Sequence, residues 1–239
     1  MKGSMQKIFD EEMFPPFEGF PKEGIQFLKK LKKNNTREWF TNHKGEYEEH
    51  VKFPMQSLIC SLQSPFQKFS PECDVHPKRS LFRIHRDTRF SKDKTPYKTH
   101  VAAHFIPSGD KKGLEGVGYY MHIEPGEIFV GGGIYMPNGD QLKNIRTAIA
   151  EHSQEFLSII KDKKFLAQFK KIDGTKLQRV PKGFEENHPM IEWLKLKQFF
   201  VGVSLPEKKC YEKNFVKEVA TICEKASPLV HFLQEACGR

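Results

Sequence analysis

Apolar residues recur at helical spacing toward both ends of the chain and alternate with polar residues in its middle. Near the start, Ile25, Leu28 and Leu31 follow one another at intervals of three, as on the buried face of an α-helix. This spacing predicts a first helix that ends before Asn34.

A second helix is expected to open at Asn35, because Glu38 stands three residues later, as in a capping box. An apolar stripe then continues at intervals of three or four through positions 47–62. Pro54 lies within this stripe and predicts a kink or a restart of the helix.

The middle of the chain has the two-residue period of β-strands. The alternation predicts strands near positions 82–84, 101–105, 119–123, 128–136 and 199–205. Positions 108–113 and 124–127 resemble hairpin loops, the second with Pro and Gly where a type II turn places them. Short connections of this kind predict antiparallel neighbours.

Helical spacing returns after Gly139, with apolar stripes in 142–159, a short helix after Pro189 and a final helix over about 208–235 that should break near Pro228. No linker or repeat separates these segments, so one α+β domain over residues 1–239 is predicted. Its antiparallel sheet would have about four to six strands, with helices from both chain ends packed mainly on one face. Residues 1–16 are expected to form a flexible or tag-derived segment.

The composition excludes global disorder. Hydrophobic residues make up 38% of the 239 residues, and 21 Phe supply bulk for a core. Five Cys without a C-x-x-C pair indicate reduced thiols in a cytoplasmic protein. Because no apolar stretch approaches the ~18 residues of a membrane span, no membrane association is expected.

The positive charge is concentrated in one segment. Of a net charge of +9, positions 76–100 carry +6, from eight Lys and Arg against Asp87 and Asp93. Arginine offers phosphate or carboxylate a planar fork and lysine adds a point charge, so we expect a small anionic ligand in a cationic pocket. The candidate binding residues in this segment are Arg83, Arg86, Arg89, Lys92, Lys94, Tyr97 and Lys98. The alternative is a structural ion-pair network with protein carboxylates.

Strand alternation adds a second group of candidates. If the strands adjoin in register, one face of the sheet is polar and rich in histidine. Three consecutive glycines weaken a strand unless a close approach requires them, and they would open space above the sheet. The alternative is a bulge packed under a helix. Such a pocket would have Gly131, Gly132 and Gly133 as its floor and His85, His104, His122, Glu124 and Tyr135 as its walls. Lys182, on a loop, and Arg146, on a helix, are further candidate binding residues.

An enzyme of hydrolase or phosphotransferase type is the first rival hypothesis. Asp87, His85 or His122 would then transfer protons while arginines stabilise developing negative charge. His104, His122 and Glu124 are candidate metal ligands only if their strands are adjacent and in register. The chain has no Walker, G-x-G-x-x-G or H-E-x-x-H motif, so the cofactor stays unknown.

Nucleic-acid binding is the second rival hypothesis. Phe90 and Tyr97 lie among the basic residues, and exposed aromatic rings beside cations are typical of surfaces on which bases stack. No sequence pattern addresses the oligomeric state.

Several of these segments resemble one known family. The runs RDTRFSKDKTPYK (86–98), GYYMHIEPG (118–126), GGGIYMP (131–137) and VPKGF (180–184), with NNTREWF (34–40) and IR (145–146), are similar to the domain-of-unknown-function 2461 family of microbial and fungal proteins. The resemblance covers about residues 17–205 and implies that the basic segment, the glycines and the PKGF loop belong to one shared feature. It implies no activity, cofactor or catalytic residue.

Overall fold

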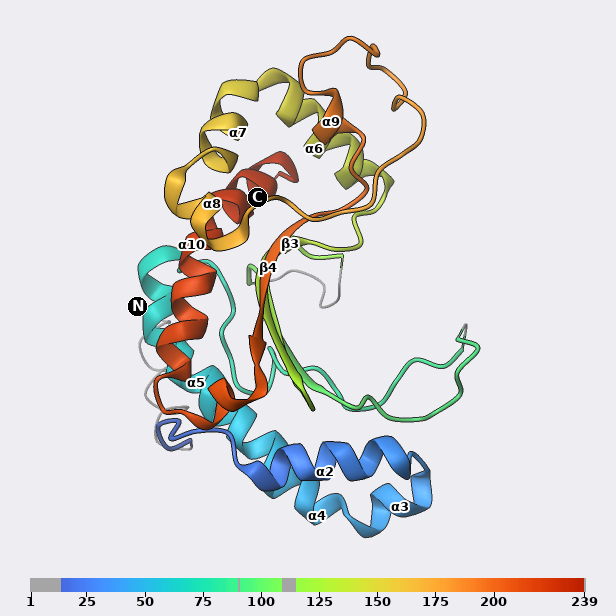
Figure 1. Ribbon diagram of the computed structural model, residues 1–239, viewed down its shortest axis with the longest axis vertical. Helices are drawn as coiled ribbons and strands as arrows, with labels where there is room; N and C mark the ends of the chain where they lie inside the picture. The colour runs from blue at the N-terminus through green and yellow to red at the C-terminus, as the bar shows by residue number, and fades with distance from the viewer. Residues whose placement is uncertain (1–13, 90, 109–114, 239) are drawn as a thin grey trace. The chain divides into compact units, whose positions relative to one another are not determined.

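A computed structural model describes residues 14–89, 91–108 and 115–238. These residues form helices and an antiparallel sheet of four strands in the order β1-β2-β3-β4 (Figure 1). The strands are β1 (Val101–Phe105), β2 (Gly118–Glu124), β3 (Glu127–Ile134) and β4 (Phe199–Pro206). The predicted α+β class and the predicted number of strands are confirmed.

The chain divides into two compact units, and each is described by itself. Unit 1 comprises Met1–Phe105, Tyr120–Val130 and Ser204–Ala220, and unit 2 comprises Ile106–Tyr119, Gly131–Val203 and Thr221–Arg239. Strands β2, β3 and β4 contribute to both units. The single domain, the coverage of mainly one sheet face and the flexible segment 1–16 stay predictions, and residues 1–13 of that segment lie outside the described residues.

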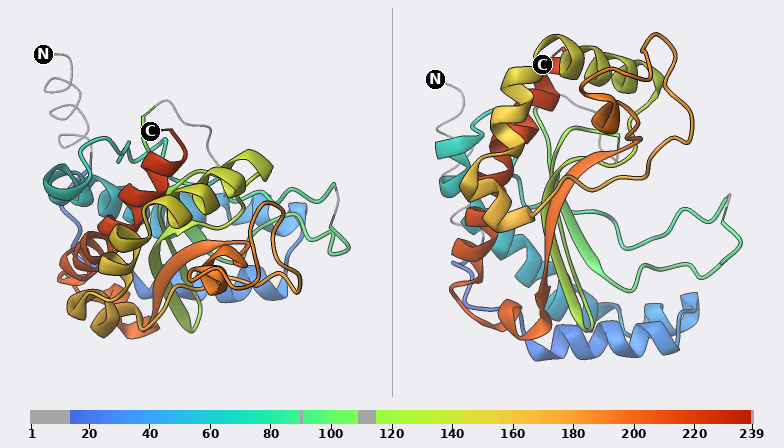
Figure 2. Two further views of the ribbon diagram at one scale, coloured as in Figure 1. Left: turned by 90° about the horizontal axis from the view of Figure 1, so that it is seen from above. Right: turned by 45° about the horizontal axis from the view of Figure 1, so that its top comes forward.

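Unit 1 contains the N-terminal helices (Figure 2). They are α2 (Lys22–Lys33), α3 (Arg37–Asn42), α4 (Lys44–Tyr47), the π-helix η1 (Glu48–Lys52) and α5 (Phe53–Phe69), and the unit also holds the 3-10 helix η2 (Glu207–Tyr211) and the start of α10 (Phe215–Ala236). Phe66 of α5 contacts Phe105 of β1 with ring centroids 4.9 Å apart. Phe27 and Phe40 join α2 to α3 in the same way at 6.3 Å. Aromatic packing therefore holds these helices together and joins α5 to the sheet.

Unit 2 contains α6 (Gly139–Glu151), α7 (Ser153–Ile160), α8 (Lys163–Phe169), α9 (Ile191–Leu194) and the rest of α10. Asn138 and Gln141 form a capping box that opens α6 where the helical spacing was predicted to return. Phe156 of α7 lies 6.2 Å from Trp193 of α9 and 5.4 Å from Phe232 of α10 between ring centroids. This aromatic cluster holds the helices of unit 2 together.

The prediction of a capping box at Asn35 was wrong. Thr36 caps α3 instead, because its hydroxyl accepts a hydrogen bond from the Trp39 amide at 3.2 Å. The Asn35 side chain is used elsewhere: its amide donates to the Tyr97 carbonyl at 2.9 Å and its oxygen accepts from the Tyr97 amide at 3.1 Å. The partner lies 62 residues away, so local spacing could not reveal it.

Two prolines behave differently. Pro54 stands in the first turn of α5, just after the π-helix, which confirms the predicted restart. The predicted break near Pro228 was wrong, because α10 continues to Ala236. Ala226 and Leu229 on either side of Pro228 are fully buried, and their packing stabilises the helix against the lost backbone hydrogen bond. The predicted start near 208 was also wrong, since η2 occupies that position.

The predicted strand at 82–84 is not a regular strand. Its neighbourhood makes two isolated antiparallel bridges, Leu81 with Ala103 and His85 with Tyr97. The chain bends at Ile84, whose side chain is only 6% exposed, and this bend interrupts the ladder. The hairpin predicted at 124–127 is confirmed, with Gly126 at the positive φ of 96° that a type II turn needs. Most of the loop at 108–113 lies outside the described residues.

Each of the five cysteines is a thiol, as predicted. Among the described residues, no helix is both long enough and apolar enough to cross a bilayer.

Candidate functional site

The basic segment forms an arm, defined here as residues 83–98, that projects from β1 as two limbs (Figures 1 and 2). The limbs are joined at their base by the backbone. The Lys98 amide donates to the Ile84 carbonyl at 2.8 Å, and the Arg86 amide donates to the Pro96 carbonyl at 2.9 Å. The arm therefore starts from a fixed base beside the sheet, while Phe90 lies outside the described residues.

Two arginines of the arm are paired with its own aspartates. Arg89 binds Asp87 at 2.8 Å, and Arg86 binds both Asp93 and the Thr95 hydroxyl. Hydrogen bonds from Arg89 hold the pKa of Asp87 at about 2, and those from Arg86 do the same for Asp93. All four charged groups are partly or largely exposed. The ion-pair alternative therefore accounts for Arg86 and Arg89.

The other cations of the arm have no carboxylate partner among the described residues. Lys94 donates to the Thr88 carbonyl at 2.8 Å, and Lys98 donates to the Arg83 carbonyl at 3.1 Å. The side chains of Arg83 and Lys92 are exposed and make no hydrogen bond or ion pair with the part of the chain described. Four of the six predicted cations thus form no ion pair with the described residues, although the Asp87 carboxylate interacts electrostatically with Arg83.

Lys98 has the most unusual environment of these cations. Its ammonium group is half-buried and lies over the Phe82 ring, 4.9 Å from the ring centroid. Burial lowers the pKa of Lys98, and the positive charge of Arg83 lowers it further. Two cations are therefore held near one another at the base of the arm.

Beside Lys98, the polar face of the sheet carries a cluster of histidine and aromatic rings. His100 and His122 lie 5.4 Å apart between ring centroids, and His122 stacks on Phe129 at 5.8 Å. Tyr120 contacts both His122 and Phe82, at 5.6 and 6.1 Å. In β2 the next residues, Met121 and Ile123, are fully buried, so strand alternation places this cluster on the exposed face.

The imidazoles of this cluster are neutral near pH 7. Burial lowers the pKa of His100 to about 4, with His122 and Lys98 adding smaller repulsions. Burial also lowers the pKa of His122, although the carboxylates of Glu124 and Glu127 act in the opposite direction. A neutral imidazole both donates and accepts a hydrogen bond, so the cluster can recognise polar groups without adding charge.

The candidate metal ligands do not come together. His104 is 8% exposed and stacks on Phe82 with ring centroids 6.1 Å apart. Within the described ranges no group of three His, Cys, Asp or Glu side chains is arranged to hold a metal ion. His104, His122 and Glu124 therefore gain no support as a metal centre.

Tyr97 belongs to the core of unit 1. It is 5% exposed and stacks on Phe40 with ring centroids 4.1 Å apart. His85 borders the same stack, 5.2 Å from Tyr97, and is itself exposed. Because Phe40 covers the Tyr97 ring, Tyr97 anchors the arm and does not present an open stacking surface.

The remaining predicted binding residues belong to unit 2, whereas the arm belongs to unit 1. The glycines leave no open space: a Cβ atom on Gly132 would lie 2.8 Å from Val230 and 3.1 Å from Tyr119. Gly131 and Gly133 approach the backbone of β4 equally closely. The three glycines are therefore closely packed, as in the alternative hypothesis, and do not form the floor of an open pocket.

Arg146 and Lys182 have separate surroundings. Arg146 donates to the carbonyls of Leu194 and Leu196 at 2.7 and 3.1 Å, and burial lowers its pKa. It thus ties α6 to the end of α9. Lys182 is exposed on a turn closed by the Phe184 amide and the Pro181 carbonyl at 3.3 Å. Tyr135 is 52% exposed and contacts Phe200.

Four members of the polar face were not among the predicted site residues: Phe82, His100, Tyr120 and Phe129. Strand parity could have indicated Phe129, because its neighbours Ile128 and Val130 are buried on the opposite face. The contacts among these missed residues depend on which strands pair, and the alternation of side chains along one strand does not determine that.

The profile of one protein family, described as "Conserved hypothetical protein (DUF2461)", matches residues 23–232. The match confirms the resemblance seen in the sequence and extends it over most of the chain. No curated protein matches the chain.

Proposed function

We propose that this chain, which belongs to the DUF2461 family, binds a small phosphate- or carboxylate-bearing molecule at the base of its basic arm. The anionic group of the ligand would contact Lys98 and Arg83. The body of the ligand would lie over the neighbouring rings of Phe82, His100 and His122.

The observation that carries this proposal is the pairing of Lys98 with Arg83. Like charges repel, and burial adds a desolvation cost, so both effects lower the pKa of Lys98. No protein carboxylate binds either side chain among the described residues. An anion bound between them would remove the repulsion and satisfy donors that are otherwise left to solvent.

The polar face supports the proposal by its chemistry. The two neutral imidazoles offer hydrogen bonds to a ligand, and the Phe82 ring offers an apolar surface already in contact with Lys98. A small molecule needs this combination of a few directed polar groups and apolar area.

Small-anion binding is favoured over the two rival functions. Of the three candidates for acid–base catalysis, Asp87 is a poor base, because its carboxylate is hydrogen-bonded to Arg89 and its pKa is held at about 2. For nucleic-acid binding, stacking would need open aromatic rings along the arm, and Tyr97 is covered by Phe40.

Isothermal titration calorimetry at low ionic strength tests the proposal with inorganic phosphate, pyrophosphate and citrate as probes. We expect at least one probe to bind and Lys98→Gln and Arg83→Gln each to weaken it about tenfold or more, because a charged hydrogen bond contributes ~1.5–3 kcal/mol. Lys98→Arg should retain most of the affinity.

Lys44→Gln is the matched control, since Lys44 is exposed in unit 1 and makes no hydrogen bond or ion pair with the described residues. Equal weakening by this control would mean that only the overall charge matters, and it would overturn the proposal. So would the absence of binding by all three anions. Salt-sensitive binding of single-stranded DNA in their place would favour the nucleic-acid hypothesis.

A further inference from the structure

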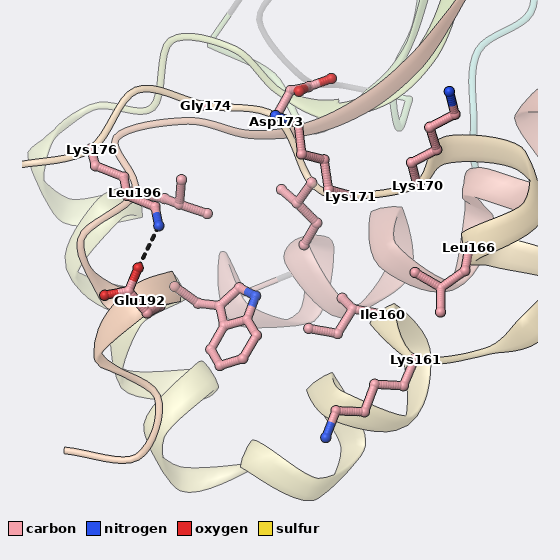
Figure 3. A pocket seen from close by; sticks show the side chains of 12 residues that line it. Ile160, Lys161, Leu166, Lys170, Lys171, Asp173, Gly174, Lys176, Glu192 and Leu196 are labelled. Atoms are coloured by element: carbon pink, nitrogen blue, oxygen red, sulfur yellow. Dashed lines mark hydrogen bonds and ion pairs between the residues drawn. The ribbon is translucent and has the colours of Figure 1, made fainter.

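Unit 2 contains a pocket of about 440 Å³ that no part of the sequence analysis anticipated (Figure 3). This volume falls within the ~300–1,000 Å³ of pockets that hold small molecules. All of its lining residues belong to unit 2, so the pocket is independent of the basic arm.

The floor of the pocket is apolar. It is lined by Ile160 at the end of α7, Leu166 of α8, Trp193 of α9 and Leu196 just after α9. Leu166 is 40% exposed, one of few large apolar side chains in the described part of the chain to be so open. When a ligand covers an exposed apolar surface in a concave site, water is removed from that surface and binding becomes more favourable.

One wall of the pocket is held by backbone pairing. Asp173 and Lys176 form isolated antiparallel bridges with Phe200 and Leu196. Between them, Gly174 lies so close to the Gln198 backbone, with φ at 157°, that a side chain would collide with it. The wall is therefore preformed rather than a loose loop.

Positive charge surrounds this floor. Four lysines line the pocket, Lys161, Lys170, Lys171 and Lys176, against Asp173 and Glu192, which gives a net +2. Glu192 binds Lys176 at 2.6 Å and neutralises it. In Figure 3 the ammonium groups of Lys161 and Lys170 lie at opposite margins of the pocket, away from this ion pair. The excess charge thus belongs to the other three lysines.

The backbone at Lys170 is strained. Lys170 has φ 63° and ψ −49°, and the Lys171 amide donates to the Phe169 carbonyl at 2.7 Å across it. This i to i+2 hydrogen bond closes a γ-turn of the rare form, which is unfavourable for a residue with a side chain. Strained backbone is concentrated at ligand sites, and here it sets the direction of two lysines at the pocket margin.

We propose that this pocket binds an amphipathic monocarboxylate, with its apolar body against Leu166 and Trp193 and its carboxylate at the margin formed by Lys170 and Lys171. A single negative charge suits the site, because Asp173 at the margin would repel a more highly charged group. This inference does not rest on the anion site of unit 1.

Tryptophan fluorescence tests the proposal directly. The chain has two Trp, so a Trp39→Phe background leaves Trp193 as the only reporter, inside the pocket. Sodium octanoate is titrated against octan-1-ol and octylammonium, which share its alkyl chain but not its charge. We expect saturable binding of octanoate at least tenfold tighter than of either comparison compound.

Variants separate this binding from general adsorption. Lys170→Gln combined with Lys171→Gln should weaken octanoate binding at least tenfold, whereas Lys163→Gln with Lys164→Gln, exposed on α8 outside the pocket lining, should not. Glu192→Gln should strengthen binding, because it releases Lys176. Equal binding of octanoate and octanol, or no effect of replacing Lys170 and Lys171, would overturn the proposal, as would the failure of octanoate to saturate.

Discussion

The backbone of Gly131 in β3 lies so close to Val201 in β4 that a Cβ atom on Gly131 would overlap the Val201 carbonyl oxygen and lie 2.8 Å from the Cα of Gly202. Gly131 and Gly133 therefore allow two neighbouring strands to approach closely. Glycine is required here because the neighbouring backbone leaves no room for a side chain, and not because a ligand lies above the sheet.

Gly131→Ala should destabilise the protein by about 3 kcal/mol, because neither backbone can move away without breaking the sheet. The free energy of unfolding in urea measures this effect. Gly139→Ala is the matched control: it opens α6, its added methyl group meets nothing within 4 Å, and the change should stabilise by about 0.5 kcal/mol. Similar values for the two variants would contradict the packing explanation.

Arg146 acts as a structural clamp in unit 2, according to its two bonds to the carbonyls of Leu194 and Leu196. Arg146→Met should lower the free energy of unfolding by about 2–3 kcal/mol, because both half-buried carbonyls lose a charged donor. Arg146→Lys should recover only part of this loss, since an ammonium group cannot reach two carbonyls as a planar fork does.

Lys143→Met provides the comparison for Arg146, because Lys143 is exposed on the same helix and makes no hydrogen bond or ion pair with the described residues. It should change stability by less than about 0.5 kcal/mol. If Arg146→Met were as mild as this control, the clamp would not be structural, and a direct role of Arg146 in binding would become the better hypothesis.

Local patterns predicted what depends on neighbouring residues. The two-residue period located β1 to β4, and Pro125 with Gly126 located the turn between β2 and β3. The predictions that failed depend on distant partners. Asn35 bonds to Tyr97 rather than capping a helix, and the chain bends at Ile84 because that side chain enters the core.

The candidate site shows the same division. The excess of charge in residues 83–98 was evident from composition, and the alternative of an ion-pair network describes Asp87 and Asp93. Which cations they would pair with could not be predicted, because the geometry of the arm decides it. The pocket around Trp193 was invisible for a similar reason: its walls come from four segments that meet only in the folded chain.

His100 should make stability depend on pH between about 4 and 6.5. Its pKa is lowered to about 4 in the folded chain, so between these values the unfolded chain binds a proton that the folded chain does not. Stability should therefore fall as the pH drops from 6.5 to 4, by about 1–2 kcal/mol once solvent screening of a half-exposed ring is counted.

The unfolding free energy at pH 7 and pH 4.5 measures this effect in the wild type and in His100→Gln. The variant should lose most of the pH dependence that His100 contributes, while His152→Gln, which removes an exposed histidine at the end of α6, controls for the substitution itself. If the free energy of unfolding of His100→Gln changed with pH as much as that of the wild type, His100 would be protonated as easily in the folded as in the unfolded chain.

Relief of the strained γ-turn at Lys170 should stabilise the fold and weaken the binding of octanoate. Glycine adopts a positive φ without strain, so Lys170→Gly should raise the free energy of unfolding by about 1 kcal/mol, even though it removes a side chain. Lys171→Gly, one residue further on, has no positive φ to relieve and should destabilise slightly. Urea denaturation and octanoate titration of both variants would show whether the strain is retained for the pocket. Lys170→Gly should be more stable than the wild type and should bind octanoate more weakly. If Lys170→Gly gained stability without losing affinity, the turn would have no role in binding.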